Sequence, residues 1–181
     1  MIMELSAGSI VQVIGRSGQG LSRLADTLRR EHEHVGVVSQ DALAHLTFLR
    51  ETVAEEVAFG LEQRGVDRQE MERRVDRMLQ LVGLNELAEA DPAALSGGQT
   101  RRLAVAAVAV REPEVLVLDD PFTGLDDTSA EQLVALCRQL PHTAVVVLGN
   151  RPHPLLPGEV LPLADAPLTP PDLQLPEPVG Q

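Results

Sequence analysis

Short, continuous apolar runs alternate along the chain with longer segments in which apolar residues recur every three or four positions. The runs are rich in β-branched residues, which is typical of buried parallel strands. They predict strands over residues 9–14, 35–38, 115–118 and 143–148. The periodic segments predict helices from Leu21 onward and over residues 51–65, 67–82, 97–111 and 128–140. Because strands and helices alternate, the expected fold class is α/β with a mainly parallel sheet.

The first predicted strand and helix enclose a glycine-rich loop, which is the local context of a phosphate-binding P-loop. The spacing G-x-x-x-x-G-K-S is intact, except that Leu21 stands where the pattern has lysine. Leucine offers phosphate neither charge nor donor, so weak binding without efficient hydrolysis is expected. Arg16 and Arg23 are nearby cations, but Arg23 is expected to face solvent. The predicted phosphate-binding residues are Gly15, Arg16, Ser17, Gly18, Gln19, Gly20, Leu21, Ser22 and Arg23.

A second glycine-rich stretch, Leu95-Ser96-Gly97-Gly98-Gln99, directly precedes the helix predicted over 97–111. Backbone N–H groups and a hydroxyl gathered at the positive end of a helix can bind phosphate. The alternative is an ordinary turn in which Ser96 caps the helix. The next strand ends in Asp119 and Asp120, at the sheet edge where ligands of open α/β sheets bind.

In this order, the two glycine-rich stretches and the acidic strand end resemble the motifs of ABC-type ATPases. The sequence from Thr52 to Gly60 resembles that of the energy-coupling-factor and cobalt-uptake ATPases in particular. The resemblance implies a three-layer P-loop NTPase fold, with a helical insert at about 51–95 and a reduced N-terminal β-lobe. It also implies ATP and Mg²⁺ as cofactors, and a second ATP-binding subunit and a transmembrane subunit as partners.

The resemblance further implies a role for each motif. Ser22, Gln40 and Asp119 would surround Mg²⁺. Asp120 stands where the family has its general-base glutamate, and Asp126 lies in the loop that crosses the dimer interface. The signature residues would face the nucleotide held by the partner subunit, and they are Ser96, Gly97, Gly98 and Gln99.

The positions that act on the chain's own nucleotide depart from the family pattern, whereas the signature is complete. Besides Leu21, aspartate replaces glutamate at Asp120, and a displacement of about 1 Å in a catalytic group can cost ~10²-fold in rate. The position of the family's histidine aligns with Leu148 and Gly149. The resemblance therefore favours the degenerate member of an asymmetric, heterodimeric pair in an energy-coupling-factor-like importer. The alternative is a non-catalytic module that senses nucleotide or acts as a scaffold.

Composition narrows the class of partner. The formal net charge of −12 argues against a surface for nucleic acid. No apolar run reaches the length of a membrane span, so we expect a cytoplasmic protein that contacts the inner face of the cell membrane only through its partner. Cys137 is the single cysteine, which fits a reducing compartment.

Proline marks the predicted domain boundary. Nine of the 13 prolines follow residue 150, and no periodicity accompanies them. The sequence therefore predicts a nucleotide-binding domain over residues 1–150 and a disordered or extended tail over residues 151–181.

Overall fold

The computed structural model describes residues 3–16, 20–31, 34–163 and 173–174 of the 181-residue chain. The chain forms two compact units. The sheet unit comprises Met1–Gln40, Pro113–Pro121 and Cys137–Gln181, and the helical unit comprises Asp41–Glu112 and Phe122–Leu136.

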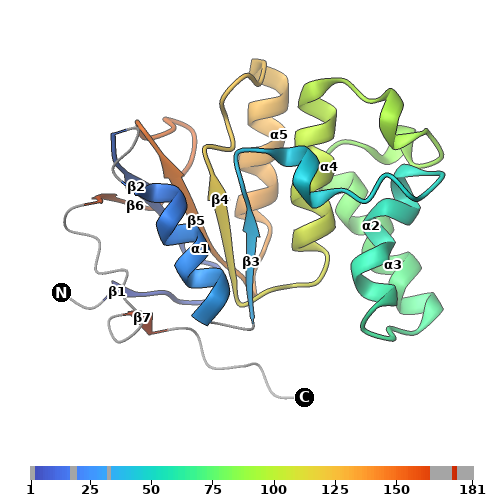
Figure 1. The fold of residues 1–181 in the computed structure, drawn as a ribbon, viewed down its shortest axis with the longest axis horizontal. Coiled ribbons are helices and arrows are strands. Elements are labelled where there is room, and N and C mark those ends of the chain that lie inside the picture. Colours follow the sequence, from blue (N-terminus) through green and yellow to red (C-terminus); the bar gives the residue numbers. More distant parts are fainter. Residues whose placement is uncertain (1–2, 17–19, 32–33, 164–172, 175–181) are drawn as a thin grey trace. The chain divides into compact units, whose positions relative to one another are not determined.

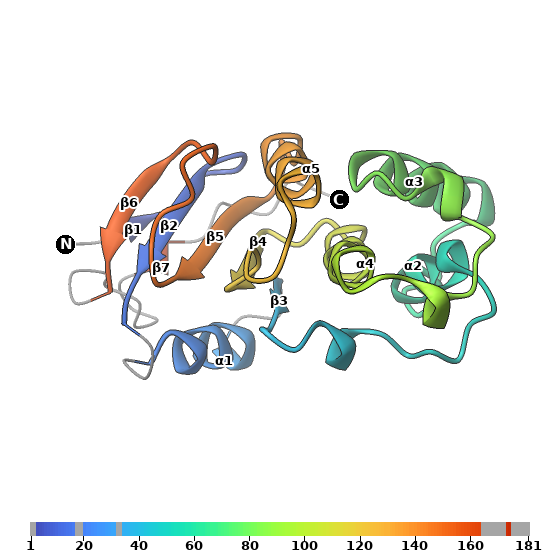
Figure 2. The same ribbon diagram turned by 90° about the horizontal axis from the view of Figure 1, so that it is seen from above.

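A five-stranded parallel sheet forms the centre of the sheet unit, with the strand order β3-β4-β5-β2-β6 (Figure 1). Its strands are β2 (Ile10–Ile14), β3 (Val35–Val38), β4 (Val115–Asp119), β5 (Ala144–Gly149) and β6 (Glu159–Pro162). Helix α1 (Leu21–Glu31) covers one face of the sheet, as Figure 2 shows. Every residue of β4 and β5 is buried, which explains why these strands appear in the sequence as continuous apolar runs. The predicted α/β class with a parallel sheet is confirmed.

Strand β6 lies beyond the predicted domain boundary, in the stretch expected to be a disordered or extended tail. It pairs in parallel with β2, from Val11 opposite Glu159 to Ile14 opposite Pro162. The N–H of Leu163 then donates to the carbonyl of Ile14 at 2.8 Å. This strand therefore belongs to the sheet although it follows the predicted boundary at residue 150. Its four residues are too few to show a period, and its partner strand lies near the other end of the chain. Residues 164–172 and 175–181 of the predicted tail lie outside the described residues.

A separate two-stranded parallel pair joins the two ends of the chain. It consists of β1 (Met3–Glu4) and β7 (Leu173–Gln174). These two residues per strand are what the structure describes of the expected N-terminal β-lobe.

The helical unit contains the predicted insert. Its helices are α2 (Val53–Glu62), α3 (Arg68–Leu81) and α4 (Gly97–Ala109). The 3-10 turn η1 (Ala42–His45) precedes α2, and the turns η2 (Asn85–Leu87) and η3 (Pro92–Ala94) lie between α3 and α4. Thr52 and Glu55 form a capping box at the start of α2, which fixes where this helix begins. Helix α5 (Asp127–Arg138) contributes residues to both units. Among the described residues, no helix combines the length and the apolar character that crossing a bilayer requires.

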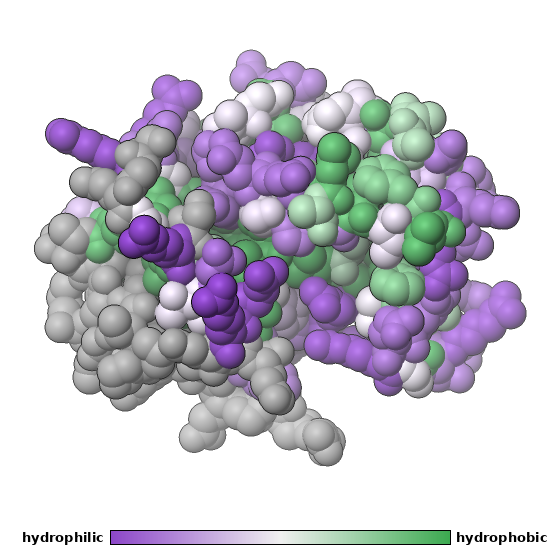
Figure 3. Space-filling view, in the orientation of Figure 1, coloured by the Kyte–Doolittle hydropathy of each residue, from purple (hydrophilic) through white to green (hydrophobic). Residues whose placement is uncertain are grey.

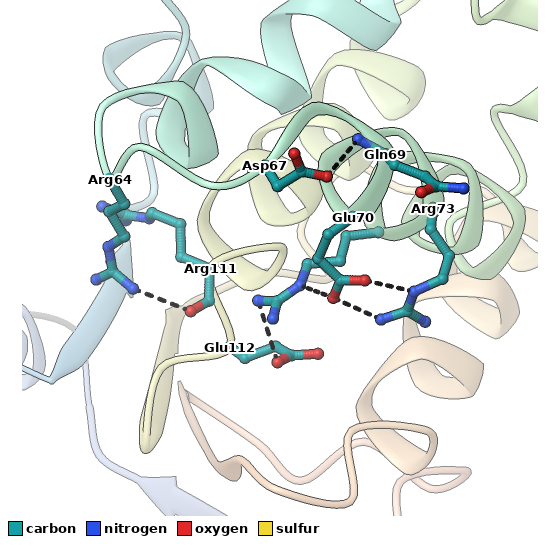
Figure 4. A network of polar contacts seen from close by, with 8 residues as sticks. Arg64, Asp67, Gln69, Glu70, Arg73, Arg111 and Glu112 are labelled. Carbon is teal, nitrogen blue, oxygen red and sulfur yellow. Dashed lines mark hydrogen bonds and ion pairs between the residues drawn. The ribbon is translucent and has the colours of Figure 1, made fainter. Parts of the chain in front are cut away.

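An arginine–glutamate network on the surface of the helical unit links α3 to Glu112, which lies shortly after the end of α4 (Figure 4). Glu70 accepts hydrogen bonds from Arg73 at 2.6 and 2.7 Å and from Arg74 at 2.6 Å. These bonds, led by that from Arg73, lower the pKa of Glu70 to about 2. Arg74 also lies 3.4 Å from Glu112. Because the network is exposed, we expect it to add little to the free energy of unfolding. We infer that its main effect is to orient α3.

The thiol of Cys137 gives a first testable prediction. Its side chain on α5 is 2% exposed, and burial raises the pKa of the thiol to about 12. Since thiolate is the reactive form, the folded protein should not be alkylated by iodoacetamide at pH 8, and full alkylation should follow addition of urea. Mass spectrometry of the intact protein measures both, with glutathione in the same tube as a control for the reagent. Rapid alkylation of the folded protein would contradict the burial of this side chain.

Candidate functional site

A pocket of about 330 Å³ opens in the sheet unit at the carboxyl ends of its strands. Its walls come from the ends of β2, β4 and β5, from the start of α1 and from the segment that follows β3. The lining residues are Gly15, Arg16, Gly20, Leu21, Arg23, Gln40, Asp119, Asp120, Gly149 and Asn150. The structure thus brings together eight of the predicted site residues, which come from three distant parts of the sequence.

The register of the parallel strands explains why these residues meet. Ile14 lies opposite Gly149, and Asp119 lies opposite Leu148, so β2, β4 and β5 end at the same level. Two backbone hydrogen bonds of 2.9 Å extend this alignment beyond the strands, from Gly15 N–H to the Gly149 carbonyl and from Asp120 N–H to the Leu148 carbonyl. Of the predicted loop, Ser17, Gly18, Gln19 and the side chain of Ser22 lie outside the described residues.

Leu21 packs into an apolar environment at the wall of this pocket. It is half-buried and lies against the core cluster of the sheet unit, as does Leu163. Both side chains approach Gly15 closely: a Cβ atom at Gly15 would lie 3.4 Å from Leu21 Cγ and 3.0 Å from Leu163 Cδ2. Leu21, the residue at the lysine position, is therefore part of the apolar packing, and a side chain at Gly15 would fit only if Leu163 shifted slightly.

The carboxylates of Asp119 and Asp120 lie in the same pocket as the amide of Gln40. Asp119 is the last residue of β4 and is 7% exposed. Oxygen donors of this kind fit Mg²⁺, which keeps several waters and is completed by phosphate oxygens in nucleotide sites. Within the described residues, no three Asp, Glu, His or Cys side chains converge as a metal site.

Asn150 is a pocket residue that the sequence reasoning missed. The position of the family's histidine aligns with Leu148 and Gly149, and the side chain of Leu148 is fully buried in the core. Gly149 lines the pocket at the end of β5, and so does Asn150, the residue that follows it. The signal that points to Asn150 is its position as the first polar residue after an apolar strand.

The Leu95–Gln99 stretch lies in the helical unit, at the start of α4. The Oγ of Ser96 accepts from the N–H of Gln99 at 3.4 Å, and Oε1 of Gln99 accepts from the N–H of Ser96 at 2.8 Å. These bonds form a capping box, so the alternative reading of Ser96 as a helix cap is correct for the local structure.

The two glycines of this stretch have different neighbours. A Cβ atom at Gly98 would lie 3.1 Å from Ser129 Oγ, so the packing within the unit restricts this position. A Cβ atom at Gly97 would meet no heavy atom of the described residues within 4 Å, and Gly97 is exposed. The described part of the chain therefore gives Gly97 no internal reason to be glycine.

Asp126 has a structural contact of its own. Its Oδ1 accepts from the N–H of Ser129 at 2.7 Å, directly before α5, and this bond lowers the pKa of the carboxyl. Asp126 thus stabilises the first turn of α5, as a capping aspartate does.

Comparison with known proteins places these features in context. Residues 1–123 match the family model described as ABC transporter. An ABC transporter ATP-binding protein of Streptomyces avermitilis is 39% identical over 155 residues, which cover 80% of this chain and 27% of that protein. The energy-coupling factor transporter ATP-binding protein of Lacticaseibacillus paracasei is 35% identical over 160 residues, which cover 76% of this chain and 57% of that protein.

Solved structures agree with this match. The cbiO1 protein of Clostridium perfringens, described as part of the ABC transporter complex cbiONQ, superposes with a TM-score of 0.71 at 26% identity, covering 82% of this chain and 70% of that one. A bacterial ABC transporter cassette in a dimeric structure gives a TM-score of 0.67 at 23% identity, which shows the shared fold. The chain spans between about a quarter and three fifths of the length of the two relatives compared by sequence.

Proposed function

The chain belongs to the ABC transporter family, and we propose that it is an ATP-binding subunit of an importer of the energy-coupling-factor type. In this proposal it is the degenerate member of an asymmetric pair, which lends Leu95–Gln99 to ATP held by a competent partner subunit. The similarity to an energy-coupling factor ATP-binding protein over three quarters of the chain supports this class.

The observation that carries the proposal is the contrast between the altered pocket of the sheet unit and the complete signature, Leu95–Gln99. In the pocket, Leu21 is packed against apolar neighbours where a lysine would bind phosphate, and Asp120 replaces the longer glutamate. In the signature, Ser96 and Gly97 are exposed at the positive end of α4. The complete signature is the part that would serve another subunit.

We assign the following roles to the pocket residues. The loop from Gly15 to Arg23 would hold the phosphates of ATP, with Ser22, Gln40 and Asp119 around Mg²⁺. Asp120 would act as a weakened general base, and Asp126 would lie at the contact with the partner subunit. Bound Mg²⁺ would supply charge neutralisation for the phosphates, while the residues of this chain orient them.

An exposed apolar segment between β3 and α2 supports a transmembrane partner. This segment, residues 43–49, presents Leu43, Phe48 and Leu49, which are 56%, 40% and 86% exposed. Figure 3 shows hydrophobic (green) residues gathered on this face of the helical unit. The buried Glu56 of α2 holds this segment in place, because its Oε2 accepts a hydrogen bond from Thr47 Oγ1 at 2.9 Å. Apolar side chains held in an exposed position favour a protein contact. We propose that the transmembrane subunit binds here and holds the chain at the cytoplasmic face of the membrane.

Turnover of the assembled complex tests the role of the signature. ATP hydrolysis by the chain purified with its partner subunits should fall at least tenfold in Ser96→Arg, because a bulky cation replaces the hydroxyl at the phosphate. Gly97→Ala should also reduce turnover, yet it keeps the capping box and meets no neighbour in the described structure. Asn85→Arg adds the same charge at an exposed position of the helical unit and should leave turnover unchanged.

The result that would overturn the proposal is an active complex in which Ser96→Arg and Gly97→Ala hydrolyse ATP at the wild-type rate. Such a result would favour the alternative, a nucleotide-sensing or scaffolding module that takes no part in turnover. Circular dichroism of each variant shows that a loss of turnover is not a loss of fold.

A further inference from the structure

The pocket of the sheet unit holds two arginines in a chain that has no lysine. Arg16 follows β2, and Arg23 lies in the first turn of α1, and both line the pocket. Arg23 is exposed, as the sequence predicted, and it also lines the pocket. The apolar side of α1 consists of Leu24, Ala25 and Leu28, which are buried, so Arg23 does not belong to the packed face of this helix.

Leu21 cannot supply the missing charge. Its side chain is half-buried against the core cluster and converges with Leu163 on Gly15, as described above. Leu21, which stands where the family pattern has lysine, therefore contributes to the apolar packing and offers no cation to a phosphate. Any positive charge for an anionic ligand must come from other residues at the pocket wall.

The charges of the pocket argue for that role. Asp119 and Asp120 place two carboxylates at the wall, and the whole chain carries a net charge of −12, so a polyphosphate would be repelled in the absence of local cations. Arg16 and Arg23 balance the two carboxylates. Guanidinium groups stay protonated at all working pH values and present a fork of donors that matches phosphate oxygens.

Building on the proposed function, we propose that Arg16 and Arg23 bind the phosphates of a magnesium–nucleoside triphosphate in this pocket and replace the absent lysine. The positive charges of the two arginines are cancelled by the negative charges of the two carboxylates. A divalent cation is therefore needed to make the binding of a nucleoside triphosphate favourable. Binding should therefore depend on Mg²⁺. The pocket would hold nucleotide as a stable ligand of the subunit, while hydrolysis takes place on the nucleotide held by the partner.

Calorimetric titration of the full chain with ATP in the presence of Mg²⁺ tests this proposal. Arg16→Gln and Arg23→Gln should each weaken binding about tenfold or more, as expected for the loss of a charged hydrogen bond. Arg30→Gln is the matched control, because Arg30 is exposed in the last turn of the same helix, outside the pocket, and its removal changes the net charge equally. Removal of Mg²⁺ by EDTA should abolish binding by the unaltered chain.

Two results would overturn the proposal. One is an unaltered chain that binds no nucleotide at millimolar concentration, and the other is equal affinity of the unaltered chain, Arg16→Gln and Arg23→Gln. Neither result removes the proposed role of the signature, which is measured by turnover of the complex with Ser96→Arg. Failure of that turnover test leaves the affinity measurement on the isolated chain intact, so the two proposals fail separately.

Discussion

Replacement of Gly158 by alanine is expected to lower the free energy of unfolding by about 3 kcal/mol, because two separate costs meet at this residue. Its φ of +111° lies in a region that side chains rarely adopt. An added Cβ would also lie 1.9 Å from the Ile10 carbonyl oxygen and 2.7 Å from its carbon. Both contacts are backbone atoms of β2, so the clash can be relieved only if β6 moves away from β2. Urea-induced unfolding followed by circular dichroism measures the loss.

Gly65→Ala separates the two costs. Gly65 also has a positive φ, of +66°, but an added Cβ would meet no heavy atom of the described residues within 4 Å. This control should lose about 1 kcal/mol, from the backbone conformation alone. Equal losses in the two variants would contradict the docking of β6 on β2. Because β6 leads directly to Leu163 beside Gly15, Gly158→Ala should also weaken nucleotide binding, whereas Gly65→Ala should not.

The contrast between β6 and the long elements shows what the sequence could predict. Helix α3 was predicted over residues 67–82 and spans Arg68–Leu81, because fourteen residues carry several turns of apolar periodicity and an aspartate cap. Strand β5 was equally clear as a buried apolar run. Strand β6 has four residues, of which Leu161 is buried and Val160 is half exposed. It is stabilised by hydrogen bonds to β2, and nothing in its local sequence identifies β2 as its partner strand.

The same distinction holds for the candidate site. Gly15, Asp119 and Asp120 were predictable because they lie at or directly after the ends of strands, and parallel strands bring their carboxyl ends to one edge. Asn150 was missed because the family pattern aligned the histidine position with Leu148 and Gly149 and gave no role to the residue that follows them. The packing of Leu163 against Gly15 could not be foreseen, because it joins residues from opposite ends of the chain. The sequence thus predicted which residues meet at the strand ends, but not the apolar contact that replaces the lysine.

Arg102 on α4 is expected to contribute strongly to the stability of the helical unit. Its side chain is 6% exposed, and its Nη1 donates to the carbonyl of Val82 and, at 3.2 Å, to that of Gly83. These carbonyls follow the last turn of α3, at the negative end of that helix, where a cation is favourable. Burial lowers the pKa of the guanidinium, but arginine remains charged. The side chain therefore fastens the helix that carries the signature to the end of α3.

Arg102→Ala should lower the free energy of unfolding by about 3 kcal/mol, because it leaves two carbonyls without their donor and opens a cavity. Arg102→Lys keeps a cation with fewer and differently placed donors, so its loss should be smaller, at about half of that value. Arg77→Ala removes the same charge from an exposed position on α3 and should change stability little. A loss below about 1 kcal/mol in Arg102→Ala would contradict the structural role of these hydrogen bonds. If the role is correct, the alanine variant should also reduce turnover of the assembled complex while nucleotide affinity of the isolated chain is kept, because the pocket lies in the sheet unit and the signature helix lies in the helical unit.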